Sequence, residues 1–286
     1  MRLSDYDTGH QMQARVMESD RITPEGSGDE VRHLVLRVMR SPDRFEAGQS
    51  VGVAVPGPHA GGHEVHFRLY SIAVVSRGSS REVSDLELCV KHCFYDDEFN
   101  GEQYSGIASN YLCDLKAGDQ ITLSGPFENA FRIPPDPSAN LLLIGMGTGI
   151  APFRALIRHI YTKLGGWVGK VRLFYGARTG LELLYMNDKR DDLKHYYDQT
   201  TFKAFEAVSP RPHMEDPIPF EDLIGNNQAE VRELIDDPAT FVYVAGLEKM
   251  IEPLDKAFID MFGSEQEWRR RRRELESQRR WVELIY

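Results

Sequence analysis

Apolar and polar residues alternate over short stretches in the first half of the chain, and turn signals separate these stretches. Residues 31–38 are Val-Arg-His-Leu-Val-Leu-Arg-Val, which has the two-residue period of a half-buried strand. Short strands at this spacing predict an antiparallel β-barrel or sandwich. We also expect one helix over residues 109–115, with Ser109 as its N-cap. The other expected strands cover residues 51–55, 69–75, 86–91 and 120–123.

The pattern changes after a proline-rich connector, residues 134–137, which neither a strand nor a helix would tolerate. Strands then alternate with helices, which indicates βαβ units and a parallel sheet covered on both faces. We therefore expect a two-domain α+β chain: an antiparallel β-barrel over residues 1–137, then an α/β Rossmann-like nucleotide domain over residues 138–286. In the second domain we expect strands at residues 140–145, 171–175, 201–208 and 241–245, and a helix at about residues 152–164.

Composition agrees with two ordinary globular domains. The chain has 286 residues, of which 41% are hydrophobic and 27% charged. No apolar run approaches the roughly 20 residues that span a bilayer, so we expect no membrane insertion. Residues 1–20 are polar and lack the apolar segment of a secretory signal, which predicts a cytoplasmic protein. The net charge of −10 argues against nucleic-acid binding.

The chain has three cysteines, Cys89, Cys93 and Cys113. An odd number without a secretory signal suggests reduced thiols. An iron–sulfur cluster usually takes four cysteines, so we expect neither a cluster nor another metal site. If the protein moves single electrons, it must exchange them with another protein.

Three motifs carry candidate chemistry. In Arg68-Leu69-Tyr70-Ser71, strand alternation places an arginine and an aromatic ring on one face, which suits the phosphates and flat heterocycle of a dinucleotide. Such residues also occur in strands as ordinary packing and surface. Residues 145–152, Gly-Met-Gly-Thr-Gly-Ile-Ala-Pro, join a strand to a helix and form either a pyrophosphate site or a tight turn without a ligand. Residues 245–247 follow the last parallel strand, at the edge where ligands of open α/β sheets bind.

These motifs, in this order, resemble the plant-type ferredoxin–NADP⁺ reductase family over residues 31–286. The resemblance rests on the Arg68 motif, on residues 109–115 and 147–154, and on the aromatic terminus Tyr286. It implies an FAD-dependent oxidoreductase that exchanges a hydride with NADP(H) and single electrons with a ferredoxin or flavodoxin. Two other classes stay open: the reductase component of an oxygenase, such as the benzoyl-CoA epoxidase system, and a flavin-free regulatory relative.

The resemblance also implies roles for individual residues. Tyr70 is expected to stack on one face of the flavin, and Tyr286 on the other until nicotinamide displaces it. Arg68 is expected to hold the FAD pyrophosphate, and Ser71 to hydrogen-bond near flavin N5. The other residues expected to contact FAD are Leu69, Cys89, Val90, Lys91, Ala108 and Ser109. Those expected to contact the nicotinamide nucleotide are Thr148, Gly149, Pro152, Gly246 and Leu247.

The chain departs from the family pattern near its last strand and its end. Ala245 stands where the family often has a cysteine. Leu284 stands where it often has an acidic residue, and Glu283 lies one position earlier. We take Ser71, Glu283 and Tyr286 as the candidate catalytic residues and expect proton delivery and nicotinamide alignment to differ from the family pattern.

Arginine and serine residues after two strands of the second domain bear on the choice between NADP and NAD. The 2′-phosphate of NADP needs cationic or hydroxyl partners. Ser209 and Arg211 follow the strand that ends at residue 208, and Arg178 follows an earlier one. We therefore expect NADP(H), while the simpler alternative is that both arginines only lie on the surface.

Five consecutive arginines, residues 269–273, are expected to lie on a helix near the C-terminus. Five consecutive residues cannot share one helical face, so most of this charge should be solvated or paired with neighbouring glutamates. A basic surface near the terminus would nevertheless attract an acidic electron carrier. The run is therefore a candidate docking surface for ferredoxin or flavodoxin.

Overall fold

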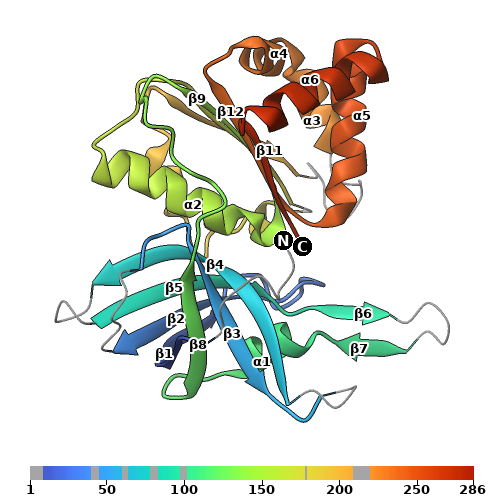
Figure 1. Ribbon diagram of the computed structural model, residues 1–286. Helices are drawn as coiled ribbons and strands as arrows, with labels where there is room; N and C mark the ends of the chain where they lie inside the picture. Colours follow the sequence, from blue (N-terminus) through green and yellow to red (C-terminus); the bar gives the residue numbers. More distant parts are fainter. Residues whose placement is uncertain are drawn as a thin grey trace. The chain divides into compact units, whose positions relative to one another are not determined.

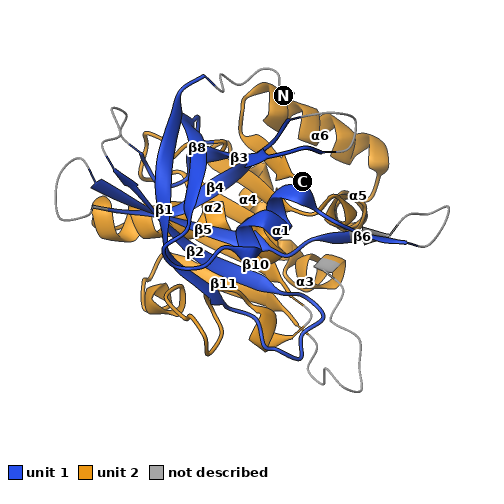
Figure 2. Ribbon diagram, turned by 90° about the horizontal axis from the view of Figure 1, so that it is seen from below, with its two compact units in different colours: residues 1–129 blue, residues 130–286 orange. Residues whose placement is uncertain are grey.

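The computed structural model of the chain describes residues 9–39, 45–59, 64–77, 83–96, 102–177, 179–208 and 220–286. Contacts within the chain divide it into two units, Met1–Asn129 and Ala130–Tyr286, which Figure 2 colours separately. Each unit has its own hydrophobic core, and each is described by itself below.

The first unit is built on a closed barrel of six antiparallel strands in the order β1-β2-β5-β4-β3-β8 (Figure 1). Helix α1 (Ile107–Asp114) adds Ala108, Leu112 and Cys113 to the barrel core. A separate two-stranded hairpin consists of β6 (Phe94–Asp96) and β7 (Gln103–Ser105). The barrel strands are β1 (Gln11–Arg21), β2 (Val31–Met39), β3 (Ser50–Pro56), β4 (Val65–Arg77), β5 (Val83–Lys91) and β8 (Gln120–Phe127).

The alternation along β2 explains the barrel core. Leu34, Leu36 and Val38 are buried there, while the two residues that alternate with them, Val35 and Arg37, are partly exposed. Sequence analysis misses β1, although the strand has the same period: Ala14 and Val16 are buried.

The N-cap prediction for α1 is wrong. The helix begins at Ile107 after Gly106, and Ser109 lies inside its first turn. The Ser109 hydroxyl donates to the Gly106 carbonyl at 3.1 Å instead of capping a backbone N–H.

The second unit is a parallel five-stranded sheet in the order β11-β10-β9-β12-β13. Figure 1 shows α2 on one face of this sheet and α3, α4, α5 and α6 on the other. The strands are β9 (Asn140–Met146), β10 (Val171–Gly176), β11 (Phe202–Ala207), β12 (Thr240–Gly246) and β13 (Trp281–Ile285). The helices are α2 (Ile150–Arg158), α3 (Phe220–Asn226), α4 (Gln228–Asp236), α5 (Ile251–Phe262) and α6 (Glu265–Ser277).

Short helical turns complete the second unit. A π-helical turn, His159–Lys163, extends α2, so the helix expected at residues 152–164 starts two positions earlier and changes its winding near its end. The 3₁₀ turns are η3 (Gly147–Gly149), η5 (Gly180–Glu182), η6 (Lys194–Tyr196) and η7 (Glu248–Met250). None of the helices that the structure describes is both long and apolar enough to cross a bilayer.

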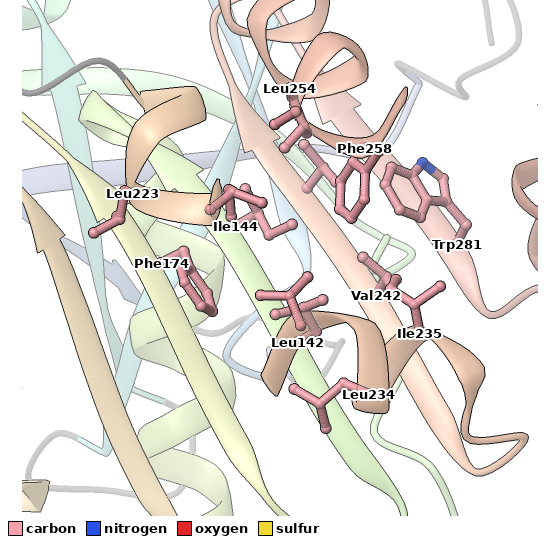
Figure 3. Close-up of a cluster of buried hydrophobic side chains, with 14 of the residues drawn as sticks. Leu142, Ile144, Phe174, Leu223, Leu234, Ile235, Val242, Leu254, Phe258 and Trp281 are labelled. Carbon is pink, nitrogen blue, oxygen red and sulfur yellow. The ribbon is translucent and has the colours of Figure 1, made fainter. Parts of the chain in front are cut away.

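Apolar residues of the parallel strands alternate between the two faces of the sheet. Leu142, Ile144 and Val242 join the cluster that α3 to α6 cover, and Figure 3 shows this cluster with Phe258 and Trp281. The second unit begins at Ala130, before the proline-rich connector. Phe131 illustrates this boundary, because its ring stacks on those of Phe153 and Tyr243, with centroid distances of 5.4 and 4.9 Å. The assignment of residues 1–137 to flavin and 138–286 to nucleotide binding stays a prediction.

Candidate functional site

The Arg68 motif lies in the middle of β4, where it pairs with β3. Arg68 and Tyr70 lie opposite Val53 and Val51, two core residues of the barrel. Residues directly opposite each other in an antiparallel pair share a face of the sheet. Arg68 and Tyr70 therefore project to the same side, as predicted, and Arg68 is exposed.

Tyr70 packs against the barrel core and is partly exposed. Burial raises the pKa of the Tyr70 phenol well above its usual value; Cys93 and Cys113 add to the rise, and Arg68 opposes it. The side chain is thus a neutral ring with one supported face, which is what stacking on a heterocycle requires.

The end of β5 and the start of α1 meet beside this motif. Asn110 donates from Nδ2 to the carbonyls of Cys93, at 2.7 Å, and Gly106, at 2.9 Å. Its Oδ1 lies 2.6 Å from His92 Nε2, and the Cys93 N–H donates to Ser109 Oγ at 3.4 Å. The strand end and the first turn of the helix are therefore tied together.

The other predicted flavin residues lie on these two elements. Cys89, Val90, Ala108 and Ser109 are buried. Lys91 pairs with Asp29 at 2.7 Å, so its charge is partly neutralised. Burial raises the pKa of the Cys113 thiol to about 12, which keeps it protonated at neutral pH.

Glu30 anchors the same region from the segment before β2. Its carboxylate accepts from Arg32 Nε at 2.6 Å and lies 3.4 Å from His92 Nδ1. Partial burial alone would raise the pKa of Glu30, but Arg32 and His92 outweigh this and hold that pKa below its usual value. A chain of polar contacts thus runs from Glu30 through His92 and Asn110 to α1.

The glycine loop between β9 and α2 is open on its outer side and tightly packed on its inner side. Gly147 has a φ of +57° and nothing near the position of a Cβ, so its backbone is accessible. A Cβ on Gly149 would meet the Ala245 carbonyl. Tyr175 fixes the loop by donating to the Gly147 carbonyl at 2.8 Å.

This geometry fits a pyrophosphate. The loop leads into the N-terminus of α2, where backbone N–H groups lack helical partners. Pro152, buried in the first turn, has no N–H to leave unpaired.

The C-terminal residue joins the glycine loop. The Tyr286 N–H donates to the Gly246 carbonyl at 3.1 Å, and Tyr286 Oη lies 2.6 Å from Thr148 Oγ1. The residue is 55% exposed. The structure therefore brings together three predicted residues from separate parts of the sequence: Thr148, Gly246 and Tyr286. Leu247 follows directly and is partly buried.

Glu283 belongs to a different environment. Its Oε1 accepts from Arg272 Nη2 at 2.6 Å and from Trp281 Nε1 at 2.7 Å, on the side of α6. The structure gives this carboxylate a role in packing β13, and its predicted catalytic role receives no support from these contacts. Ser71, in β4, lies opposite Ser50 of β3. The predicted phosphate residues Arg178, Ser209 and Arg211 lie outside the described residues.

Sequence reasoning misses the residues that hold the site in place, namely His92, Asn110, Tyr175 and Arg272. Asn110 was part of a recognised segment, and its position one residue after Ser109 was the available signal. Nothing local in the sequence indicates the partners of the other three. Among the described residues there is no group of three or more His, Cys, Asp or Glu that could hold a metal ion.

Comparison with known proteins agrees with this arrangement. A family model of the oxidoreductase NAD-binding domain matches residues 143–256. The chain is 30% identical to a ferredoxin–NADP reductase of Synechocystis sp., covering 93% of this chain and 65% of the relative. It is 32% identical to the cyanelle ferredoxin–NADP reductase of Cyanophora paradoxa, covering 85% of this chain and 67% of the relative. The chain thus spans about two thirds of the length of these relatives.

Among solved structures, the ferredoxin–NADP⁺ reductase from Plasmodium falciparum with 2′P-AMP is similar over 98% of both chains. The TM-score is 0.69 and the sequence identity 18%. This likeness shows the same two-part fold, a barrel followed by a parallel sheet.

Proposed function

The chain belongs to the ferredoxin–NADP reductase family, and from this we propose that it exchanges a hydride with NADP(H) and single electrons with ferredoxin through bound FAD. One observation supports this proposal most directly. The last residue, Tyr286, lies on the glycine loop at the edge of the parallel sheet, hydrogen-bonded to Thr148 and Gly246. An exposed aromatic ring at this position is suited to cover a flavin and to yield to a nicotinamide.

The first unit holds FAD. Bound FAD converts between two-electron and one-electron transfer, which the amino acids cannot do. Tyr70 offers a supported ring for stacking, and the exposed residue Arg68 on the same face would pair with the pyrophosphate. The first turn of α1, which includes Ser109, would add backbone N–H donors. We assign to Ser71 a hydrogen bond at the flavin atom that receives the hydride.

The second unit holds NADP(H). The glycine loop and the N-terminus of α2 bind the pyrophosphate, with Thr148, Gly149 and Pro152 lining it. Gly246 and Leu247 flank the nicotinamide side. Tyr286 occupies the nicotinamide position until the cofactor displaces it, so part of the binding free energy is used in this displacement and product release is fast.

Preference for NADPH is assigned to Arg178, Ser209 and Arg211. A charge-assisted contact to phosphate contributes on the order of 1.5–3 kcal/mol, so losing one lowers kcat/KM for NADPH roughly 10- to 100-fold. If Arg178→Ala and Arg211→Ala both leave the NADPH/NADH ratio of kcat/KM unchanged, the 2′-phosphate site lies elsewhere.

The carrier is a ferredoxin in the cytoplasm, and a flavodoxin of similar acidity fits the same chemistry. The oxygenase alternative has no feature of the described residues in its favour. The test is to purify the protein, record its flavin spectrum, and mix it anaerobically with NADPH and then with ferredoxin. Bleaching by NADPH and recovery on addition of oxidised ferredoxin are expected. A colourless protein, or a flavin that NADPH cannot reduce, contradicts the proposal.

A further inference from the structure

The five arginines of α6 differ in what they contact. Arg269 pairs with Glu265 at 2.5 Å and Arg270 with Glu267 at 3.9 Å, all within the helix. The side chains of Arg269 and Arg270 are 68% and 76% exposed, whereas that of Arg272 is only 20% exposed. The run is therefore not a uniform basic surface, since the side chains of Arg271 and Arg272 are only 17% and 20% exposed.

The Arg272 guanidinium binds carboxylates from three elements. Nη2 donates to Glu283 in β13 at 2.6 Å, and Nε donates to Glu276 in α6 at 3.0 Å. Nη1 donates to both oxygens of Asp255 in α5, at 2.9 and 3.1 Å. Burial opposes the charge, but Glu283, Asp255 and Glu276 outweigh it and raise the pKa of Arg272. Its fork geometry allows all three contacts at once, which a lysine could not reproduce.

Two tryptophans make these contacts part of the core. Trp281, the first residue of β13, donates to Glu283 and lies under the guanidinium, with 5.4 Å from Arg272 Cζ to the ring centroid. Trp268 donates to Asp255 at 2.9 Å and stacks on Phe258 with centroids 4.3 Å apart. Figure 3 shows Trp281 beside Phe258 in this cluster. The ion pairs of Arg272 are thus supported by the packed rings of Trp268 and Trp281.

The contacts matter because of what β13 carries. In the described sheet, β13 lies at the edge and pairs with β12 alone. Edge strands at a chain terminus are the segments most prone to fraying. Tyr286 is the residue directly after this strand, three positions beyond Glu283. Whatever fixes Glu283 therefore fixes the strand that presents Tyr286.

We propose that Arg272 is a positioning residue: by holding Glu283 it sets how readily Tyr286 leaves the glycine loop, and so how tightly NADP⁺ binds. This inference rests on the proposed function, because it assumes that Tyr286 and nicotinamide compete for one place. It assigns to Glu283 the role of an anchor for the C-terminal strand.

If Arg272 had a purely structural role, its loss would change NADP⁺ affinity in the opposite direction. Loosening a domain that only needs Arg272 for stability should weaken NADP⁺ binding. Loosening a tail that competes with nicotinamide should strengthen it. The direction of the change in NADP⁺ affinity therefore separates the two roles.

The experiment uses the FAD-loaded protein and four variants: Arg272→Gln, Glu283→Gln, the double variant, and Arg270→Gln as a matched control on the same helix. Release of Tyr286 by carboxypeptidase A measures tail opening, and titration with NADP⁺ measures affinity. We expect Arg272→Gln and Glu283→Gln each to speed tyrosine release about tenfold and to tighten NADP⁺ binding, as for loss of a charge-assisted hydrogen bond. The double variant should exceed neither single variant by much, since each single variant already breaks the Arg272–Glu283 pair. Arg270→Gln should behave as wild type in both assays.

A Tyr286→Ser background completes the design. There, Arg272→Gln should no longer change NADP⁺ affinity. Unchanged tyrosine release in both single variants overturns the proposal, and so does faster release with unchanged or weaker NADP⁺ binding. If Arg272→Gln does not fold, the near-isosteric Glu283→Gln carries the test. A wild-type protein that binds no NADP⁺ at all would contradict the proposed function instead, while tyrosine release would still report on the anchor.

Discussion

Tyr70 and Tyr286, the two rings that we propose to stack on a flavin, are held by different forces. Tyr70 is fixed by packing against the barrel core. Tyr286 makes hydrogen bonds to Thr148 and Gly246, and the residue is 55% exposed. Packing resists displacement more than exposed hydrogen bonds do. The arrangement therefore suits a permanent stack at Tyr70 and a displaceable one at Tyr286.

Removing the Tyr70 ring should weaken FAD binding. An aromatic stack is worth about 0.5–1.5 kcal/mol beyond area burial, so Tyr70→Ala should raise the dissociation constant of FAD at least about 2- to 10-fold. Tyr70→Phe keeps the ring and serves as the control. The measurement is the recovery of flavin fluorescence on dissociation. Equal FAD affinity in the alanine and phenylalanine variants would remove the stacking assignment.

The Tyr286 hydroxyl should restrain the ring through Thr148. A hydrogen bond has a net worth of about 0.5–1.5 kcal/mol, and less when exposed, so Tyr286→Phe should tighten NADP⁺ binding by up to roughly 10-fold. Tyr286→Ser removes the ring as well and should tighten it further, lower kcat through slow release, and improve the use of NADH. Titration with NADP⁺, followed by the flavin charge-transfer band, measures this. If the serine variant has wild-type affinity and spectrum, the tail does not cover the flavin.

These residues show what the sequence can and cannot predict at this scale. Local motifs identify Arg68, Tyr70 and the glycine loop, because their chemistry depends on neighbours in the sequence. The partners of Thr148 and Glu283 are different. Thr148 meets a residue at the far end of the chain, and Glu283 is paired by an arginine from a preceding helix. Only the fold brings such residues together, so the sequence does not indicate that Glu283 is hydrogen-bonded to Arg272, and its catalytic role stays a prediction.

At the scale of elements, β1 and α1 show two separate sources of error. The two-residue alternation of β1 is present in the sequence. The buried residues of this strand are few and small, however, and polar residues dominate it. The start of α1 was misplaced because Ser109 has the right residue type for an N-cap. Its hydroxyl is used instead to bind Gly106 and Cys93, within the contacts that tie β5 to α1.

The polar chain from Glu30 to α1 predicts a defined pH dependence. Because the pKa of Glu30 is lowered in the folded state, its contribution is present above the unfolded value of about 4.5 and is lost as the pH falls through the lower folded value. The free energy of unfolding should therefore decline in acid, and Glu30→Gln should show a smaller decline. Urea unfolding between neutral pH and pH values below 4.5 measures the difference. Glu25→Gln, at an exposed position nearby, is the control. Parallel curves for wild type and Glu30→Gln would exclude this contribution.

At the scale of the whole molecule, two architectures share one chain, and the sequence distinguishes them well. Alternating short strands and continuous apolar strands have different periods, because a barrel strand is buried on one face and a parallel strand on both. The fold class is therefore confirmed. The charge distribution is harder to predict, since five consecutive arginines turn out to be largely paired within the second unit.

This pairing sharpens the prediction for electron transfer to an acidic carrier. The protein carries a net charge of −10, so at long range it repels an acidic ferredoxin. At physiological ionic strength exposed charges are screened beyond about 8 Å, so the charged groups near the contact dominate the interaction with a docked carrier. Arg269, Arg270 and Arg273 are the exposed members of the run, and the pairing of Arg269 and Arg270 with glutamates weakens but does not cancel their field.

We therefore expect ferredoxin reduction to slow moderately as salt rises, while reduction of a neutral dye stays constant. Replacing both Arg269 and Arg270 by Gln should weaken this dependence, because it removes two of the three exposed arginines of the run and leaves Arg272 and the exposed Arg273 in place. Stopped-flow rates from low to high ionic strength provide the measurement. A rate that rises with salt would show that net repulsion dominates at contact. A decline that persists unchanged in the double variant would place the docking surface away from α6.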